Sequence, residues 1–478
     1  MSAVAKFIAI ILFFSSAKVF VPISGDKILF LPSNIDSHVL YLSRLAADLA
    51  ELGHTTTVVA PSNARVPDFT GNIFSGKFSY LKYAFNGPRC SPSDCQSECD
   101  ALEKDHDLMR QISYGGFQFA VMDHHAAYCF CTIPYSLGIP YGKFSTSSYS
   151  SIYLYWISKM SFVQQVQVQL FVDEDELQRE KRTYKVSDGL PVDTGQLMQE
   201  TSLWFFLEHF AVSYVHPQLL NAVIVGDIMA RRRGKALPLE LEKFMSSTKA
   251  IILVSLGNNI PRNVLWMLCD AFDEFESYVG VVWRMEETEI CSDKENVRLM
   301  PWIPQNDLLA DHRVEMFISS GSFNSIVESV YHAKPLIIFP NSSDQWLNAA
   351  AAKSKGFAII IDPKSVVHKG DIRNNIINLL QVPDYKRATL RASAILRDQR
   401  DTPAQRVSAM IDHVIKYGDK HLQSEVIMLT HDDLLLFVEV IIVTMMCVSM
   451  LLSCICCCSC YWLFVKCVNT CKKNLKIE

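Results

Sequence analysis

The run MFISSGSFNS, residues 316–325, places one glycine among several serines directly after a short apolar strand. A strand that ends in a glycine-centred turn and leads into a helix presents backbone N–H groups, and the helix dipole adds positive potential at the same point. The run therefore predicts an anion-binding turn, followed by a helix that begins near Asn324. Because Gly321 is the only glycine, the residues leave open how firmly the turn holds a phosphate.

Side chains that suit a nucleotide sugar follow other strands of the same half. Trp302 offers a flat face for a base, Gln305 offers amide edges, and Glu328, one turn into the helix, can accept from vicinal hydroxyls. Asp344 and Gln345 open the next predicted helix and suit sugar hydroxyls. The predicted nucleotide-sugar contacts are Ser255, Asn258, Trp302, Gln305, Ser320, Gly321, Ser322, Asn324, Ser325, Glu328, Asp344 and Gln345.

Two further residues in the first half could perform proton transfer. His38 opens a helix after one strand, and Asp123 ends another strand. A histidine beside a carboxylate can take a proton from a hydroxyl while the carboxylate fixes its tautomer. Sequence alone does not show that the two touch. His38 could instead be a capping or surface histidine, and His124 and His125 are rival partners.

The strands that position these residues alternate with helices. Residues 27–32 and 55–61 read as apolar strands, and the helical spacing of the leucines between them predicts a βαβ unit. Further strands are predicted at 117–123, 221–227, 250–257, 278–285, 314–319, 335–340 and 357–362. The fold class is therefore α/β, with two Rossmann-like domains that face a cleft and hold ligands at the carboxyl ends of their strands. The net charge of -5 argues against nucleic acid as a partner.

Both ends of the chain carry membrane signals. A lysine, a short apolar run and small residues predict a signal peptide at about 1–24. The uncharged apolar run 440–465, followed by lysines, predicts a transmembrane segment at 434–465 with a cytosolic basic tail at 466–478. The remaining predicted boundaries are an acceptor-binding domain at 25–226, a linker at 227–238 and a donor-binding domain at 239–425. A local disulfide among Cys90, Cys95 and Cys99 is expected in an oxidising compartment, with the pairing left open.

Residues 300–351, MPWIPQNDLLADHRVEMFISSGSFNSIVESVYHAKPLIIFPNSSDQWLNAAA, resemble the donor-binding signature of the UDP-glycosyltransferase family, of the membrane-bound UDP-glucuronosyltransferase type. The resemblance extends to residues 36–61 and 236–245 and to the C-terminal span. It implies a GT-B fold and an inverting transfer, without metal or other cofactor, from a UDP-sugar to a small lipophilic acceptor. It also implies His38 as base, Asp123 as its orienting carboxylate, and a type I protein of the endoplasmic reticulum with a lumenal body.

The phosphate turn departs from the family's pattern, which usually reads His-Gly-Gly where this chain has Ser320, Gly321 and Ser322. Loss of a donor predicts a slow transferase; the alternative is a weak or inactive member that binds UDP or partners, family members included. Ser322 would be strained if its position needed φ > 0, and Asn258 replaces a small hydroxyl residue. Asn341 heads a glycosylation sequon that we expect to be buried and unmodified. The residues do not identify the acceptor, the sugar or the oligomeric state.

Overall fold

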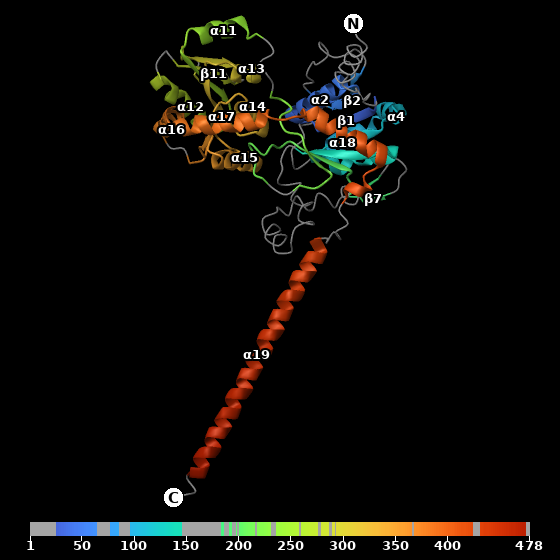
Figure 1. Cartoon of the computed structure of the whole chain (residues 1–478), viewed down its shortest axis with the longest axis vertical. Coiled ribbons are helices and arrows are strands. Elements are labelled where there is room, and N and C mark those ends of the chain that lie inside the picture. The colour runs from blue at the N-terminus through green and yellow to red at the C-terminus, as the bar shows by residue number, and fades with distance from the viewer. Residues whose placement is uncertain are drawn as a thin grey trace, which may run out of the picture. The chain divides into compact units, whose positions relative to one another are not determined.

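The computed structural model describes residues 25–64, 77–85, 96–145, 183–185, 191–193, 197, 200–215, 218–230, 236–257, 260–275, 279–285, 289–291, 293–365, 368–423 and 431–474. The chain divides into one unit of Met1–Tyr153 with Val172–Ser424, and a second of Leu154–Phe171 with Glu425–Glu478. The first unit contains two parallel sheets with their helices, and the second contains one long helix (Figure 1). The predicted signal peptide lies outside the described residues.

The first sheet is parallel throughout, with the strand order β3-β2-β1-β4-β5-β8-β9. Its order reverses between β1 and β4, which makes the gap at their carboxyl ends the topological switch point. The strands are β1 (Lys27–Leu31), β2 (Thr55–Pro61), β3 (Phe78–Tyr83), β4 (Phe119–Asp123), β5 (Tyr141–Ser145), β8 (Leu203–Phe206) and β9 (Ala222–Ile224).

Helix α2 (Asp36–Glu51) connects β1 to β2 and buries Val39, Leu42, Leu45 and Leu49, and the three leucines pack against the first sheet. Their spacing of three and four residues gives the helix one apolar face, so its first turn is fixed at the end of β1. The remaining helices of this half are α3 (Gln96–Lys104), α4 (His106–Tyr114), η2 (His124–Ala126), α5 (Ala127–Phe130) and α6 (Thr132–Leu137), and a hairpin comprises β6 (Thr183–Lys185) and β7 (Pro191–Asp193).

The second sheet is also parallel, in the order β12-β11-β10-β13-β14-β15, with its switch point between β10 and β13. Its strands are β10 (Ala250–Ser255), β11 (Val279–Arg284), β12 (Val297–Met300), β13 (Val314–Ser319), β14 (Leu336–Ile338) and β15 (Ala358–Ile360). Its helices are α11 (Leu239–Ser246), α12 (Arg262–Phe272), η3 (Asp273–Phe275), α13 (Gln305–Leu309), α14 (Phe323–Tyr331), α15 (Ser343–Ser354), α16 (Lys369–Gln381) and α17 (Pro383–Arg397).

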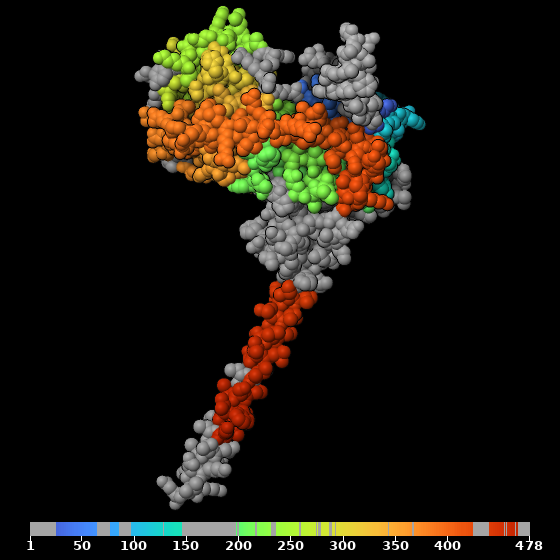
Figure 2. Space-filling model, in the orientation of Figure 1, coloured from blue at the N-terminus to red at the C-terminus, as the bar shows by residue number. Residues whose placement is uncertain are grey.

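Helix α18 (Pro403–Tyr417) returns to the first sheet, where it packs against α2, β8 and β9, and the short η4 (Lys420–Leu422) follows it. Arg406 donates to the carbonyls of Ile224 and Val225 at 3.0 and 2.6 Å, and His54 lies 2.8 Å from the Ser408 hydroxyl. In Figure 2, α16 to α18 form a continuous orange band across the visible face. The predicted second domain, 239–425, thus includes a helix that belongs structurally with the first sheet.

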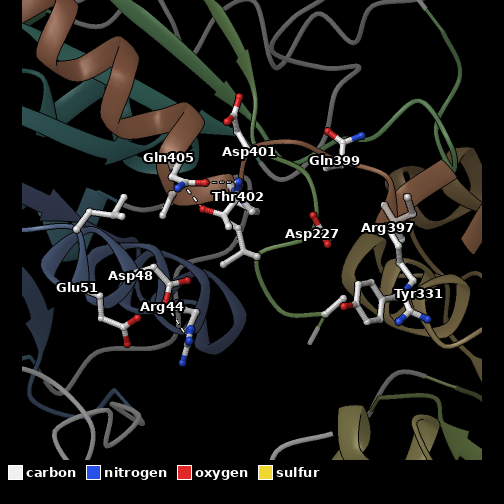
Figure 3. Close-up of a pocket in the computed structure, with 16 residues that line it drawn as sticks. Arg44, Asp48, Glu51, Asp227, Tyr331, Arg397, Gln399, Asp401, Thr402 and Gln405 are labelled. Carbon is white, nitrogen blue, oxygen red and sulfur yellow. Dashed lines mark hydrogen bonds and ion pairs between the residues drawn. The ribbon is translucent and has the colours of Figure 1, made fainter. Parts of the chain in front are cut away.

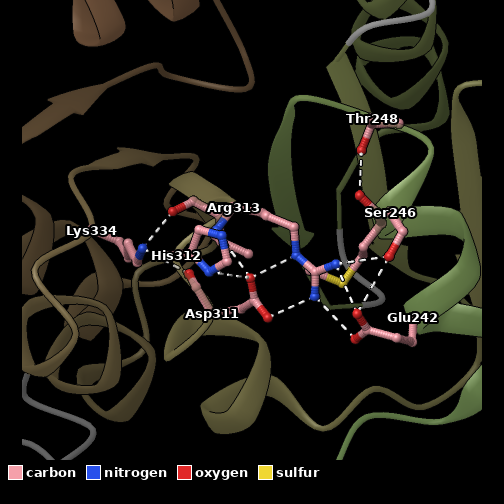
Figure 4. Close-up of polar contacts among 9 residues, drawn as sticks. Glu242, Ser246, Thr248, Asp311, His312, Arg313 and Lys334 are labelled. Carbon is pink, nitrogen blue, oxygen red and sulfur yellow. Dashed lines mark hydrogen bonds and ion pairs between the residues drawn. The ribbon is translucent and has the colours of Figure 1, made fainter.

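An ion network ties α11 to the start of β13 (Figure 4). Arg313 donates to both oxygens of Asp311, at 2.9 and 2.8 Å, and to both oxygens of Glu242, at 2.9 and 3.0 Å. The Asp311 side chain is only 1% exposed, and the Arg313 guanidinium supplies the opposite charge to this buried carboxylate. Lys334 donates to the carbonyls of Asp311 and Val314 at 2.9 and 2.5 Å, and burial lowers its pKa to about 8.

Helix α19 (His431–Asn474) forms the described part of the second unit, and its stretch Glu439–Leu463 is long and apolar enough to cross a membrane. That stretch overlaps the span predicted at 434–465.

Two disulfides join described residues, Cys99–Cys129 and Cys269–Cys291. Cys99 therefore bonds to a partner outside the predicted group of three, and Cys90 and Cys95 lie outside the described residues.

Candidate active site

The switch point of the first sheet brings a histidine and a carboxylate together. His38 lies in the first turn of α2, Asp123 is the last residue of β4, and His38 Nδ1 is 2.6 Å from Asp123 Oδ2. Both side chains are buried, at 9% and 1% exposure. The short contact indicates that Nδ1 carries the proton and that Nε2 presents a lone pair, which is the tautomer a general base requires.

Further donors hold the Asp123 carboxylate in one orientation, and one of them is His125 Nδ1, 3.3 Å from Oδ1. Ser33 contributes its backbone N–H at 3.2 Å and its hydroxyl to Oδ2, and the backbone N–H of His125 donates to Oδ1 at 3.0 Å. Burial alone would raise the pKa of Asp123, but His38 and the hydrogen bonds from His125 and His38 hold that pKa well below its usual value. Asp123 is therefore an anion that can stabilise an imidazolium.

Tyr41, one turn after His38, connects this helix with the second sheet's half. Its ring stacks at 6.4 Å from the His38 ring, and its hydroxyl lies beside the side chains of Asn324 and Glu328. Burial raises the pKa of Tyr41 to about 12, so the phenol stays protonated and can donate. Through the Tyr41 side chain, helix α2, which carries His38, contacts helix α14, which follows the predicted phosphate turn.

The turn between β13 and α14 is built around Gly321. Its φ of +92° disfavours any side chain, and a Cβ there would lie 2.7 Å from Ile338 Cγ2. Its N–H donates to Ser319 Oγ at 3.1 Å and its carbonyl accepts from Asn348 at 3.2 Å. Ser322, in contrast, has φ -60° and ψ 143° as the N-cap of α14, so the strain considered for a non-glycine residue at this position does not arise.

Asn324 carries the clearest sign of a ligand. Its side chain lies in the first turn of α14 and is 6% exposed, yet neither amide atom has a well-formed hydrogen-bond partner among the described residues. Buried amides are rarely left in that state because the cost is about 1–3 kcal/mol. A polar group placed at the helix N-terminus, such as a phosphate oxygen, would satisfy the amide.

Four of the predicted nucleotide contacts already touch one another. Gln305 Nε2 donates to Glu328 Oε2 at 2.6 Å and lies 3.4 Å from Ser325 Oγ, while Ser322 Oγ donates to Ser325 Oγ at 2.9 Å. Burial raises the pKa of Glu328 to about 7, against the hydrogen bond from Gln305. Trp302, before α13, is 67% exposed and leaves its ring face open to a base.

The remaining predicted donor contacts lie at the edge of this group. Asp344 is exposed and accepts from Ser342 Oγ at 2.5 Å, and the Gln345 side-chain oxygen accepts from the Asn341 N–H at 2.8 Å. The Gln345 carbonyl would be 3.3 Å from a Cβ on Gly321, so the start of α15 borders the turn. Ser255 is 7% exposed at the end of β10, beside Ser319 of β13. Asn258 lies outside the described residues.

We expect the glycosylation sequon to be buried, but the structure places it at the surface. Asn341 and Ser342 are both exposed, because the segment between β14 and α15 runs over the surface.

Two groups of described side chains are close enough for a metal ion: His38, Asp123 and His125, and Asp26, His54 and Asp412, each with ligand atoms within 4.8 Å of one another. In the first group both Nδ1 atoms face the carboxylate, as donors. In the second, His54 Nε2 faces Ser408 Oγ and its Nδ1 has no partner among the described residues. We interpret both as hydrogen-bonded groups.

Ser33, Tyr41 and His125 belong to the site but were not predicted as part of it. The residue pattern offers His125 only as a rival partner in the predicted histidine–carboxylate pair. Nothing in that pattern marks Ser33 or Tyr41. The position of Tyr41 three residues after His38, on the same face of the helix, is the one signal that could have indicated it.

A cavity of about 530 Å³ lies elsewhere, at the C-terminal half of α2 (Figure 3). Arg44 and Asp48 of α2 line one side, Asp227 another, and Arg397 stacks on Tyr331 at the far side. Burial raises the pKa values of Asp48 and Asp227 to about 6. The cavity contains none of the predicted site residues and is distinct from the His38 pair.

A family model described as "UDP-glucoronosyl and UDP-glucosyl transferase" matches residues 142–474. The chain belongs to the UDP-glycosyltransferase family. As a UDP-glycosyltransferase it transfers a sugar from a UDP-sugar donor to an acceptor.

Curated relatives of this UDP-glycosyltransferase include human 2-hydroxyacylsphingosine 1-beta-galactosyltransferase, which is 26% identical over 445 residues, 83% of this chain and 81% of the relative. UDP-glucuronosyltransferase 3A1 of Bos taurus is 25% identical over 441 residues, 80% of this chain and 83% of the relative.

Solved structures share the fold at low sequence identity. The Phytolacca americana UGT2 complex with UDP-2fluoro-glucose and pterostilbene has a TM-score of 0.58 and 14% identity, and covers 82% of this chain and 99% of that one. TcCGT1 in complex with UDP has a TM-score of 0.60 and 15% identity, and covers 83% of this chain and all of that one. The two Rossmann-like halves of this UDP-glycosyltransferase match the architecture of GT-B glycosyltransferase structures.

Proposed function

We propose that the chain transfers a hexose or glucuronic acid, with inversion at the anomeric carbon, from a UDP-sugar to a hydroxyl of a small lipophilic acceptor. The observation that carries this proposal is the 2.6 Å contact between His38 Nδ1 and Asp123 Oδ2 at the switch point of the first sheet. It leaves Nε2 as a base in a protein whose family transfers sugars from UDP.

In the proposed step His38 Nε2 takes the proton of the acceptor hydroxyl as its oxygen forms a bond to the sugar's anomeric carbon. The bond from that carbon to the diphosphate oxygen breaks, and UDP leaves with the electron pair. Asp123 stabilises the imidazolium that forms, and the proton later passes to water. No metal or other cofactor is required, because the N–H groups at the N-terminus of α14 can take the charge that UDP gains.

We assign the donor contacts by chemistry. Trp302 stacks on uracil, Gln305 binds its edge, and Glu328 accepts from the ribose hydroxyls. The turn at Ser320, Gly321 and Ser322, together with Asn324, binds the diphosphate, and Asp344 and Gln345 bind the sugar. The buried amide of Asn324, which has no well-formed hydrogen bond among the described residues although the Tyr41 hydroxyl lies beside it, and the contact between Gln305 and Glu328 support this assignment.

In this proposal Ser320 limits the rate of sugar transfer. It stands where the family's pattern has a histidine, and loss of one donor to the leaving group costs about 10²- to 10³-fold in rate. The half-buried Ser320 has a short hydroxyl that replaces this contact only in part. A slow transferase is therefore the expected result.

The relatives guide the choice of donors and acceptors. The name of the human relative specifies galactose and 2-hydroxyacylsphingosine, and that of the Bos taurus relative specifies glucuronic acid. The first screen therefore includes UDP-galactose and UDP-glucuronic acid as donors and hydroxylated lipids among the acceptors. We also propose that the protein is a type I protein of the endoplasmic reticulum, with α19 as its span, a lumenal body and a cytosolic tail.

The same turn favours a second candidate function. With Ser320 and Ser322 in place of the usual residues, the chain could bind UDP or a partner, family members included, with little turnover. The two candidates differ in one observable, sugar transfer at saturating donor.

A donor screen tests the proposal. Microsomes that contain the full chain are incubated with UDP-glucose, UDP-galactose or UDP-glucuronic acid and a panel of phenols and hydroxylated lipids, beside microsomes with His38→Ala. We expect a conjugate with at least one pair of substrates and at least about a 100-fold lower rate in His38→Ala. UDP binding without any conjugate would favour the second candidate, and no UDP binding at millimolar nucleotide would exclude both.

A further inference from the structure

A second buried carboxyl group, that of Glu98, contacts the loop that leads to the base. Glu98 belongs to helix α3 and is 1% exposed. Its Oε2 accepts from the backbone N–H of Asn34 at 2.9 Å, and its Oε1 accepts from the Tyr83 hydroxyl at 2.6 Å. Asn34 lies in the loop between β1 and α2. Glu98 therefore joins a helix far along the chain to the segment just before His38.

Burial of this carboxyl group is costly, so its contacts need an explanation. The described groups that act on its pKa are Tyr83, Asn34 and Asp123, and none of these three is a cation. Burial and the nearby charge of Asp123 raise the pKa of Glu98 to about 7, against the two hydrogen bonds. An apolar side chain of similar size would fill the same space without this cost. The explanation lies in the backbone that the Glu98 oxygens hold.

The residue before Asn34 holds the carboxylate of Asp123. Ser33 donates its backbone N–H to Asp123 Oδ2 at 3.2 Å and its hydroxyl to the same atom. The Ser33 carbonyl accepts from the N–H of Ile35 at 2.7 Å, and the carbonyl of Ile35 accepts from the N–H of His38 at 2.9 Å. A shift of the loop at Asn34 therefore moves both the donors to Asp123 and the first turn of the helix that carries His38.

Helix α2 has no side-chain cap of its own, so contacts of the preceding loop fix its start. Ile35 is the N-cap residue, and its side chain makes no capping hydrogen bond. Glu98 instead holds the backbone N–H just before the helix, and it does so from a different element. That element is fixed in turn, because Cys99 forms a disulfide with Cys129 of α5 and both lie in the core cluster that contains Tyr83.

We propose that Glu98 is a positioning residue for the proton transfer at His38. One of its oxygens holds the Asn34 N–H, the loop then presents both Ser33 donors to Asp123, and Asp123 orients the imidazole. Glu98 acts through these groups and not on the substrate. The inference rests on the proposed function and adds a positioning residue to it.

The need for an acceptor oxygen distinguishes this role from packing. Because the pKa of Glu98 is about 7, a neutral carboxyl group is already populated at neutral pH, and the oxygen that faces Asn34 matters more than the charge. Glu98→Gln keeps such an oxygen, and its amide can donate to the Tyr83 hydroxyl. Glu98→Ala leaves the Asn34 N–H without its acceptor, so the loop moves to restore a hydrogen bond. Tyr83→Phe is the matched control, because it removes the other bond of the same carboxyl group.

The test measures kcat and the dissociation constant for UDP in the purified full chain, with UDP-glucose and 4-methylphenol or the faster pair found in the donor screen. We expect kcat to fall about 10- to 100-fold in Glu98→Ala, because a small displacement of the base is costly, with UDP affinity within about threefold. Glu98→Gln and Tyr83→Phe should keep kcat within about threefold. A fall in Tyr83→Phe as large as in Glu98→Ala, or no recovery in Glu98→Gln, overturns the inference.

Glu98→Asp decides the question if Glu98→Ala gives no cooperative thermal unfolding. This variant keeps the charge, but its carboxylate is one methylene further from the Asn34 N–H. We expect its kcat to be at least about fivefold below that of Glu98→Gln at the same UDP affinity. Equal kcat in Glu98→Asp and Glu98→Gln overturns the inference.

A readout without turnover separates failure of this inference from failure of the proposed function. In a chain labelled with nitrogen-15 histidine, the Nδ1 proton that His38 donates to Asp123 gives an NMR signal, assigned by its loss in His38→Asn. We expect this signal to shift or disappear in Glu98→Ala and to keep its wild-type position in Glu98→Gln and Tyr83→Phe. That pattern supports the inference even if no acceptor is glycosylated, whereas an unchanged signal in Glu98→Ala overturns it.

Discussion

The substitution Gly321→Ala tests whether the turn before α14 holds the diphosphate. At φ +92° an alanine is strained by about 1–2 kcal/mol, and its Cβ would lie 2.7 Å from Ile338 Cγ2 and 3.3 Å from the Gln345 carbonyl. Overlap of this kind in a packed site adds about 1–3 kcal/mol. The turn relieves the overlap by moving, and the N–H groups of α14 then no longer converge on the ligand.

If the strain and the overlap, together about 2–5 kcal/mol, are lost from ligand binding, the affinity becomes roughly 30- to 5,000-fold weaker. Isothermal titration of the purified chain with UDP-glucose measures it directly. Gly138→Ala is the matched control, because Gly138 also has a positive φ, +64°, but a Cβ there meets nothing within 4 Å. If Gly321→Ala binds UDP-glucose as tightly as Gly138→Ala does, the turn does not hold the diphosphate.

Three further changes test other parts of the account. Ser320→His should restore a donor and raise turnover by about 10²-fold in a UDP-release assay, and an unchanged rate would count against Ser320 as the cause of slow transfer. Because burial raises the pKa of Glu328 to about 7 and its ionised form is the better acceptor, UDP-glucose affinity should rise with pH through about 7, and Glu328→Gln should remove that slope in titrations at about pH 6 and 8. Arg313→Gln removes the guanidinium that bridges the buried Asp311 and Glu242 and should cost about 3 kcal/mol in denaturant unfolding, whereas Arg387→Gln, at an exposed pair, should change nothing measurable; equal effects would refute the network's role.

The strands that hold the site were predictable where apolar runs end in polar residues. Residues 55–61 and 314–319 are strands with the predicted bounds, because β-branched and apolar residues fill them. Strand β5 was missed because Lys143 interrupts it; in the fold that lysine is 1% exposed and lies over the Trp204 ring at 4.6 Å. The contact with Trp204 that stabilises the buried Lys143 forms only in the tertiary structure, so the local sequence does not reveal it.

The candidate site, like the fold, was predictable only in part. Parallel strands place their carboxyl ends at one edge, so the order of the elements put His38 and Asp123 at the same edge of the sheet, but it did not show that they touch. The contacts of Tyr41 with the second half and of His125 with Asp123 depend on side-chain directions, which residue spacing does not give. The return of α18 to the first sheet is likewise invisible in its own amphipathic pattern, because that pattern shows which face is apolar and not what covers it.

The central claim is that His38 acts as a base on an acceptor beside bound UDP-sugar. The most direct measurement compares kcat and the dissociation constant for UDP in wild-type chain and His38→Asn, which keeps an N–H toward Asp123 but cannot take a proton. The account predicts a fall in kcat of at least about 100-fold with UDP affinity within about threefold. An unchanged kcat, or a loss of UDP affinity as large as the loss of kcat, would contradict it.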